Sequence, residues 1–339
     1  MPSEVAITIV TYNSAPYIAR CLESISSQDL AGIDVVVVDN ASSDGTLDRL
    51  AGRVRIVRNA INVGFAAGQN QAIAQTDSEW VLALNPDVRL ESNFISTLLA
   101  AGRADPQVGV VCGKLRRMSV DFEPLEPPVL DSTGMYFTPA LRHFDRGSGM
   151  HDDRRCDQVE YVFGATAAAA LYRRSMIEDV AVFEEFFDSD FFAYREDADV
   201  AWRMQLLGWK CLYVPAAVGY HVRRVTTEDR RSAGAAINMH SVKNRWLMRI
   251  KNITPSLYAR HFLAITARDF LVLGGCLAGE WSSLAAFPRI VRLWSRMRRK
   301  RREIMRRRRA SDVYMNAWFA SEPVSLPAHD IAAKCALLC

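Results

Sequence analysis

The chain has 339 residues, half of them apolar and one quarter charged, which is typical of a globular protein with one or two domains and excludes a disordered chain. Its net charge of +4 is unevenly spread, because residues 292–309, "RLWSRMRRKRREIMRRRR", hold eleven Arg or Lys and one Glu. The rest of the chain is therefore net acidic. The basic segment predicts a polyanionic partner, either nucleic acid or anionic lipid.

Seven cysteines are scattered along the chain without a CxxC pair. Cys335 and Cys339 lie close together, but no histidine stands between them. This pattern predicts a reduced, cytoplasmic protein. The first residues, "MPSEVAITIVTYN", lack a basic stretch followed by a long apolar core, so we expect no signal peptide.

The first 115 residues alternate strand and helix patterns. Apolar runs predict five strands, at 5–13, 33–40, 54–59, 79–87 and 108–114, and helices at 15–28, 66–76 and 91–103. The run "IDVVVVDN" is apolar on both faces, as expected of a buried parallel strand. We therefore predict an open, mostly parallel α/β sheet flanked by helices.

Polar residues follow three of these strands, where such a sheet binds its ligands. They are Thr11, Tyr12 and Asn13 after the first strand, Asp39 and Asn40 after the second, and Asn85 and Asp87 after the fourth. Any one strand-end Asp could simply cap the next helix. Three strand ends with the same pattern favour a ligand site.

The second half of the chain begins with a looped insertion at 119–160, rich in Pro, Asp and Gly, which could contain a hairpin. A small-residue strand is expected at 161–174 and a helix from Asp197 to about Leu207, ended by Gly208. Residues 210–221 predict an edge strand that ends at His221.

From about residue 240 the sequence becomes amphipathic, aromatic and basic. Its longest apolar run, 270–279, is about half a membrane span, and charged residues stand on both sides of it. This pattern predicts a pair of helices lying at a membrane interface rather than a spanning segment. The alternative is a small helical subdomain packed on the sheet.

Several stretches, in this order, resemble the family 2 glycosyltransferases, and among them the bacterial rhamnosyltransferase-like group. They cover about 9–221 and are "IVTYN", "VVDNASSDGT", "NVGFAAGQN", "LNPDV", "FGATAAAALYRR" and "FFAYREDADVAWRMQLLGWKCLYVPAAVGYH". The resemblance implies the GT-A fold, a Rossmann-like open sheet. It also implies transfer of a sugar from a nucleotide-diphospho-sugar.

The resemblance assigns the donor-binding residues. Thr11, Tyr12, Asn13 and Asp39 should line the base and ribose pocket, with Asn40 beside them. A carboxylate can accept from a pyrimidine N–H, which would otherwise be buried without a partner at a cost of about 1–3 kcal/mol. Gly64, Gly68 and Asn70 should lie beside the donor; the alternative for the two glycines is a loop and a tight helix–strand contact.

The resemblance also implies a metal site. "NPD" stands in place of the family's acidic triplet, with Asn85 as its first residue, so Asp87 is the main carboxylate for Mn²⁺ or Mg²⁺. His221 matches the family's downstream metal-associated histidine. Taken alone, a histidine after a strand is more often structural.

The acids of "YREDAD" are the candidates for catalysis. Acids suit the first turn of a helix, which is one explanation for Glu196, Asp197 and Asp199. The family's general base is the Asp of "ED", here Asp197, with Glu196 as second choice. We expect repulsion from Glu196 and Asp199 to raise the pKa of Asp197. Asp199 could equally pair within the helix, since Arg195 and Arg203 are in reach.

Two departures bear on the acceptor. The family's Gly-Gly-Phe-Asp-Glu run is replaced by "VAVFEEFFDSD" at 180–190, so the acceptor side of the pocket should differ. The Gln-x-x-Arg-Trp motif of processive synthases is replaced by "RMQLLGW", which favours transfer of a single sugar.

Together these features predict an inverting, metal-dependent glycosyltransferase that uses dTDP-rhamnose or a UDP-sugar. Its acceptor would be a polyprenyl-diphosphate-linked or cell-surface glycan at the inner face of the membrane. The expected domains are a catalytic domain at 1–235, with a donor half at 1–115 and an acceptor half at 116–235, a basic helical region at 236–310, and a tail at 311–339. The alternatives are a nucleic-acid-binding protein that uses 292–309 and an inactive nucleotide-sugar-binding protein.

Overall fold

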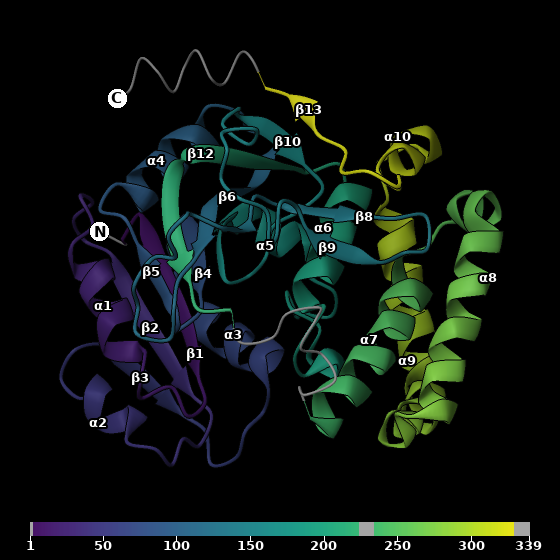
Figure 1. Cartoon of the computed structure of the whole chain (residues 1–339), viewed down its shortest axis with the longest axis horizontal. Helices are drawn as coiled ribbons and strands as arrows, with labels where there is room; N and C mark the ends of the chain where they lie inside the picture. The colour runs from purple at the N-terminus through teal and green to yellow at the C-terminus, as the bar shows by residue number, and fades with distance from the viewer. Residues whose placement is uncertain (1–2, 224–233, 329–339) are drawn as a thin grey trace.

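The computed structural model describes residues 3–223 and 234–328 of the chain. Eleven strands form one sheet: β1 (Val5–Thr11), β2 (Asp34–Asp39), β3 (Arg55–Arg58), β4 (Trp80–Leu84), β5 (Val88–Leu90), β6 (Val108–Arg117), β7 (Leu130–Ser132), β10 (Glu160–Val162), β11 (Ala169–Arg173), β12 (Lys210–His221) and β13 (Leu326–Pro327). Nine of them run in the order β13-β10-β12-β6-β11-β4-β1-β2-β3, with β5 on β12 and β7 on β6. A separate hairpin joins β8 (Met135–Phe137) to β9 (His143–Asp145) (Figure 1).

The direction of the strands places the polar strand ends together. β3, β2, β1 and β4 are mutually parallel, as are β6 and β12, while β11 is antiparallel to both β4 and β6. It follows that β1, β2, β4 and β12 all end at one edge of the sheet. Every residue of β1 and β4 is buried, which agrees with their nearly continuous apolar sequence.

Helices flank this sheet. The first ones are α1 (Ile18–Ser26), α2 (Thr46–Leu50), α3 (Phe65–Ile73) and α4 (Phe94–Arg103), followed by α5 (Arg174–Val180), the short η1 (Ser189–Phe191) and α6 (Glu196–Leu206). The alternation predicted for the first 115 residues is confirmed, and α2 is a short addition. The hairpin expected within 119–160 is the β8–β9 pair.

Two expectations for the second half were wrong. Residues 210–221 do not form an edge strand, because β12 lies between β10 and β6 and is bonded to both. Its apolar residues fill the sheet interior, where partners far away in sequence cover both sides. Residues 161–174 do not form one strand either; the segment is divided between β10 and β11.

The C-terminal region forms a block of helices beside the sheet, at the right of Figure 1. It contains α7 (Ala235–Asn252), α8 (Pro255–Ala278), η3 (Trp281–Ala285), α9 (Ala286–Arg307) and α10 (Asp312–Ala317). The block packs on α6, because Trp202 and Leu206 share one apolar cluster with Leu247 of α7 and Met297 of α9. The region is therefore helical as predicted, but it covers α6 rather than the sheet.

The basic segment 292–309 is only partly free. Lys300 is buried and pairs with Asp188, Asp190 and Glu185, while Arg301 and Arg307 donate to backbone carbonyls. These contacts hold α9 on the body of the protein, so much of the charge that predicted an external polyanion is used internally. The five cysteines in the described part of the chain are free thiols, and Cys335 and Cys339 lie outside the described residues.

Candidate active site

The ends of β1 and β2 form one cluster of polar side chains. Thr11 Oγ1 donates to Asp39 Oδ1 at 2.8 Å, and the Ser42 hydroxyl and backbone N–H donate to the two Asp39 oxygens at 2.6 and 3.0 Å. Asp39 is almost fully buried. Because an ionised carboxylate has about four acceptor positions, three donors leave Asp39 able to accept from one more.

The residues after β1 make a tight turn over this cluster. Asn13 has a φ of 51°, and its side-chain oxygen accepts from the Ser43 N–H at 2.9 Å. Its own N–H donates to the Ser42 hydroxyl at 2.9 Å. Tyr12, by contrast, is largely exposed, so its ring is accessible to a ligand at this edge.

Four further predicted donor residues build the neighbouring part of the site. The Asn40 amide donates to the Gly64 carbonyl at 3.2 Å and accepts from the Asn59 amide at 2.8 Å. A Cβ on Gly64, which has a φ of 87°, would lie 2.5 Å from the Phe192 carbonyl oxygen. Gly64 therefore brings this loop against the segment that precedes α6.

Gly68 and Asn70 serve the scaffold of the site. A Cβ on Gly68 would lie 3.0 Å from the Val10 side chain, so the glycine lets α3 pack closely on β1. This is the helix–strand contact weighed above for the glycines. The Asn70 amide donates to the Phe187 carbonyl at 2.6 Å and accepts from the Phe187 N–H at 2.9 Å, and so fixes the chain before η1.

The segment after β4 meets the end of β12. Val88 is registered against His221, and the Asp87 carbonyl accepts from the Val222 N–H at 3.0 Å. Asp87 Oδ1 lies 3.5 Å from His221 Nε2, and the other ring nitrogen, Nδ1, lies 2.7 Å from Asp131 Oδ2. The two predicted metal residues are thus brought together, and Asp131 orients the histidine.

This pair fits a divalent cation that shares its coordination with a ligand. The contact with Asp131 turns His221 Nε2 toward Asp87, and a carboxylate behind a ligating histidine is a common arrangement at metal sites. Burial lowers the pKa of His221, but its contacts with Asp131 and Asp87 outweigh burial and raise the pKa to about 10. A cation would displace that proton. The described residues contain no cluster of three or more metal-ligating side chains, so diphosphate oxygens would have to complete the coordination.

The three acids at the start of α6 have different surroundings. Asp197 is partly buried, and its two oxygens accept from the Ala198 N–H at 2.7 Å and the Ala167 N–H at 3.4 Å. The next carbonyl, of Ala168, accepts from the Asn85 N–H at 2.9 Å. Asp197 and the "NPD" segment are therefore linked through the adjacent residues Ala167 and Ala168.

Glu196 and Asp199 do not share this role. Glu196 is buried, one of its oxygens has no hydrogen bond in the described structure, and burial together with Asp197 raises its pKa well above the usual range. Asp199 is fully buried and pairs with Arg203 and Lys251 at 2.9 and 2.8 Å. Of the three, Asp197 is the carboxylate suited to accept a proton.

The cause of the raised Asp197 pKa differs from our expectation. Burial comes first and the charge of Asp145 second, and together they raise the pKa to about 6. Asp199 is not a main cause, because it is neutralised by Arg203 and Lys251, whereas the mutual repulsion of Glu196 and Asp197 is expressed in the raised pKa of Glu196. Asp145 is carried by β9, in the insertion.

A continuous chain of charged groups links the two parts of the site. Arg223 contacts Asp145 at 2.8 Å and Asp131 at 3.3 Å, and Asp131 contacts His221. Electrostatic contacts therefore run from Asp87 through His221, Asp131, Arg223 and Asp145 to Asp197. The sequence alone missed Asp131, Asp145 and Arg223; the only signal was the acid content of the insertion.

The segment that leads into α6 is held by α7. Phe192, Tyr194 and Arg195 all have φ near 70°, which is unfavourable for residues other than glycine. The Asn244 amide donates to the carbonyls of Phe191, Ala193 and Tyr194 at 2.7–2.9 Å. Asn244 therefore stabilises a strained backbone directly before the candidate base.

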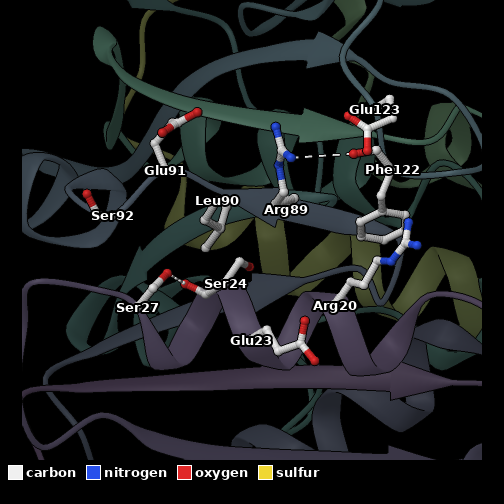
Figure 2. A pocket seen from close by; sticks show the side chains of 10 residues that line it. All are labelled: Arg20, Glu23, Ser24, Ser27, Arg89, Leu90, Glu91, Ser92, Phe122 and Glu123. Carbon is white, nitrogen blue, oxygen red and sulfur yellow. Dashed lines mark hydrogen bonds between the residues drawn. The ribbon is translucent and has the colours of Figure 1, made fainter.

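A concavity lies away from these residues. It is an open hollow of about 620 Å³ between α1, β5 and the loop at 122–123, lined among others by Arg20, Arg89 and Phe122 (Figure 2). Arg89 donates to the Phe122 carbonyl at 3.4 Å. None of the predicted site residues lines this hollow, so it is not the predicted donor site.

Comparison with known proteins agrees with this arrangement. Residues 6–181, more than half of the chain, match the family model "Glycosyl transferase family 2". The chain belongs to glycosyl transferase family 2. It is therefore a glycosyltransferase. The matched region includes the residues described above at the ends of β1, β2 and β4, from Thr11 to Asp87.

A relative of this glycosyltransferase is the N-acetylglucosaminyl-diphospho-decaprenol L-rhamnosyltransferase of Mycobacterium tuberculosis. It is 29% identical over 255 residues, which cover 70% of this chain and 82% of the relative. The pre-mycofactocin glycosyltransferase of the same species is 26% identical over 67% of this chain and 44% of its own length. The similarity to the first relative places the enzyme in the rhamnosyltransferase-like group.

Solved structures confirm the GT-A fold of the glycosyltransferase. A structure of GalNAc-T7 with UDP, GalNAc and Mn²⁺ superposes with a TM-score of 0.58 at 12% identity, covering 78% of this chain and 51% of that one. Residues 1–349 of TarS from S. aureus superpose with a TM-score of 0.52 at 17% identity, covering 89% of each chain.

Proposed function

We propose that this glycosyltransferase transfers a single sugar, with inversion, from dTDP-rhamnose or a UDP-sugar to a lipid-linked or cell-surface glycan. The observation that carries the proposal is the position of Asp197, whose carboxylate accepts from the Ala167 N–H, one residue before the Ala168 carbonyl that accepts from the Asn85 N–H. The name of the M. tuberculosis relative supports both a rhamnose donor and a diphospho-polyprenol acceptor.

The donor would bind across the ends of β1, β2 and β4. Asp39 would accept from the base or ribose, Tyr12 would contact the base, and Asn85 with Asp87 would face the diphosphate. Gly64 and Asn70 would shape the pocket indirectly, because both hold the segment at 187–192. A hydrogen bond from the base or ribose would occupy the one acceptor position of the Asp39 carboxylate that the protein leaves free.

Asp197 would act as the general base. The acceptor hydroxyl attacks the anomeric carbon, its proton passes to Asp197, and the C–O bond to the nucleotide diphosphate breaks. A pKa near 6 leaves Asp197 mostly ionised at neutral pH and makes it a stronger base than an ordinary Asp. Inversion requires the base and the leaving diphosphate to lie on opposite faces of the sugar.

The residues present fit Mn²⁺ or Mg²⁺ as cofactor, held by Asp87 and His221 together with the donor diphosphate. Such a cation would supply positive charge against the negative charge that develops on the leaving group. The Mn²⁺ in the GalNAc-T7 structure is consistent with this assignment.

We further propose that the enzyme works at the inner face of the cell membrane, in the synthesis of a cell-surface polysaccharide. The catalytic residues lie within the proposed domain 1–235, the region 236–310 would associate with the membrane, and 311–339 would be a tail. The engagement of Lys300, Arg301 and Arg307 within the protein weakens contact with either polyanion equally. The diphospho-decaprenol in the name of the M. tuberculosis relative is what favours lipid over nucleic acid.

The experiment is a transfer assay with dTDP-rhamnose and a panel of UDP-sugars, using a polyprenyl-diphospho-N-acetylglucosamine acceptor with Mn²⁺ or EDTA. We expect one donor to be used, loss of activity in EDTA, and a product whose anomeric configuration is opposite to that of the donor. Asp197→Asn should lower transfer about 100-fold to 10,000-fold. Asp77→Asn is the matched control, because Asp77 is an exposed acid three residues before β4, at the other edge of the sheet.

Full activity of Asp197→Asn, or a product with the donor's configuration, would show the mechanism to be wrong. Nucleotide-dependent thermal stabilisation without transfer to any acceptor would instead favour the inactive binding protein.

A further inference from the structure

The helix α8 has an apolar face that no described part of the protein covers. Leu263 and Phe270 are 80% and 71% exposed, and Leu277 is 49% exposed. Steps of seven residues keep these three side chains on one side of the helix. In Figure 1, α8 is the outermost element of the helical block.

The opposite side of α8 is fixed to the protein. Leu257, Ile265 and Cys276 are buried. Asp269, the helix's single acid, pairs with Arg245 and Arg249 of α7 at 3.1 and 2.6 Å. These two ion pairs turn the negative charge inward and leave the outer face without an acid.

Exposed arginines also lie on α9. Four arginines of α9, which follows α8 and η3, are exposed and take no part in the internal ion pairs described above. They are Arg292, Arg298, Arg299 and Arg302. The single acid of α9, Glu303, already pairs with Arg306 and Arg307. The exposed side of α9 is therefore basic, and its single acid is already paired.

We propose that the outer face of α8, together with the free arginines of α9, is a docking surface for an anionic lipid bilayer. The inference deepens the proposed function, on which it rests, by naming the surface that meets the membrane. An exposed apolar stripe beside uncompensated basic residues is the pattern of helices that lie in the bilayer interface. Each exposed arginine adds attraction to anionic headgroups.

The helix lies on the membrane rather than across it. With 24 residues, α8 is the one helix of the described structure that is long and apolar enough to span. However, its inner face is packed on the protein, and its mid-helix Asp269 is held by α7. Spanning would separate these ion pairs and expose charged groups to hydrocarbon.

The test is co-sedimentation of the full-length protein with vesicles of phosphatidylcholine, with and without phosphatidylglycerol. We expect binding that requires the anionic lipid. The double variant Leu263→Ser/Phe270→Ser should bind the vesicles at least about tenfold more weakly than the wild type, because it loses the burial of two apolar side chains. Val313→Ser, which removes an apolar side chain that is 81% exposed on α10, is the matched control and should bind normally.

The same variants separate this inference from the proposed function. The double variant should keep its turnover with a short, water-soluble acceptor and lose it only with an acceptor embedded in vesicles. If neither the wild type nor any variant transfers a sugar, the proposed function is overturned, but the vesicle-binding result remains valid. Normal vesicle binding by the double variant would overturn the docking surface.

Two further outcomes would also overturn it. Resistance of the wild-type protein to alkaline carbonate extraction would indicate a spanning helix. Concentration-dependent dimerisation that the double variant abolishes, without any vesicle binding, would show that a second copy of the chain covers α8.

Discussion

The exchange of Asp197 for Asn should inactivate the enzyme and stabilise it. The pKa of Asp197 rises from 3.8 to about 6 in the folded protein, because burial and Asp145 disfavour the charged form. A shift of one pKa unit is worth about 1.4 kcal/mol, so keeping this carboxylate ionised costs the fold up to roughly 3 kcal/mol at neutral pH. Asn removes the charge with almost no change in shape.

The pH dependence of this gain follows from the direction of the shift. Below pH 3.8 the carboxyl is protonated in both the folded and the unfolded chain, so it costs nothing. The cost appears between pH 3.8 and about 6 and is complete above that range. We therefore expect Asp197→Asn to be about 1–3 kcal/mol more stable than wild type at pH 8 and little different at pH 4. The lower limit of about 1 kcal/mol allows for the unfavourable contact between the side-chain NH₂ group of the introduced asparagine and the N–H of Ala167 or Ala198, since both groups are donors.

Urea unfolding at the two pH values measures the gain, and a transfer assay measures the loss of activity, which should be about 100-fold to 10,000-fold. Asp199→Asn is the control, because it lies two residues away but pairs with Arg203 and Lys251. Removing one member of a buried ion pair should cost about 3–5 kcal/mol. A gain for Asp197→Asn that is equal at pH 4 and pH 8, or substantial activity of that variant, would refute the reasoning.

Three further predictions concern the residues that support the site. Asp131→Asn, which loosens His221, should raise the Mn²⁺ concentration needed for nucleotide-dependent thermal stabilisation by about 10-fold to 100-fold, and an unchanged midpoint would contradict its orienting role. Asn244→Ala should lower kcat while nucleotide binding stays intact, because it frees only the strained segment before Asp197; steady-state kinetics and nucleotide titration measure the two effects. Gly64→Ala should lower both activity and the melting temperature, because its Cβ would lie 2.5 Å from the Phe192 oxygen, whereas Gly274→Ala, with nothing within 4 Å, should do neither.

The donor half of the site could be predicted because its information is local. Thr11, Asp39 and Asp87 each stand directly after an apolar strand, and parallel strands bring such ends to one edge. His221 was found only through its place in a family motif. The structure shows why that place matters, since β5 and β12 pair so that Val88 opposes His221.

The rest depended on contacts between distant parts of the sequence. Asp145 and Asp131 lie in an insertion without clear periodicity, and nothing in the sequence shows which carboxylates they face. The three acids of "EDAD" were expected to act on one another, but successive helix positions are turned by about 100°. That turn sends Asp199 inward to Lys251 and leaves Asp197 near Ala167.

The C-terminal helices join the proposed membrane surface to the catalytic acid. Asp188, just before η1, pairs with Lys251 of α7 at 2.5 Å and with Lys300 of α9 at 2.6 Å, and these cations hold its pKa well below the usual range despite burial. Lys251 also pairs with Asp199, which lies two residues after the candidate base Asp197. The boundary proposed at residue 235 thus separates two sequence patterns, yet side chains from both sides of it form one buried ionic cluster. Because buried ion pairs of this kind resist separation, a bilayer that fixes α8 and α9 would also fix the orientation of the site toward its lipid-linked acceptor.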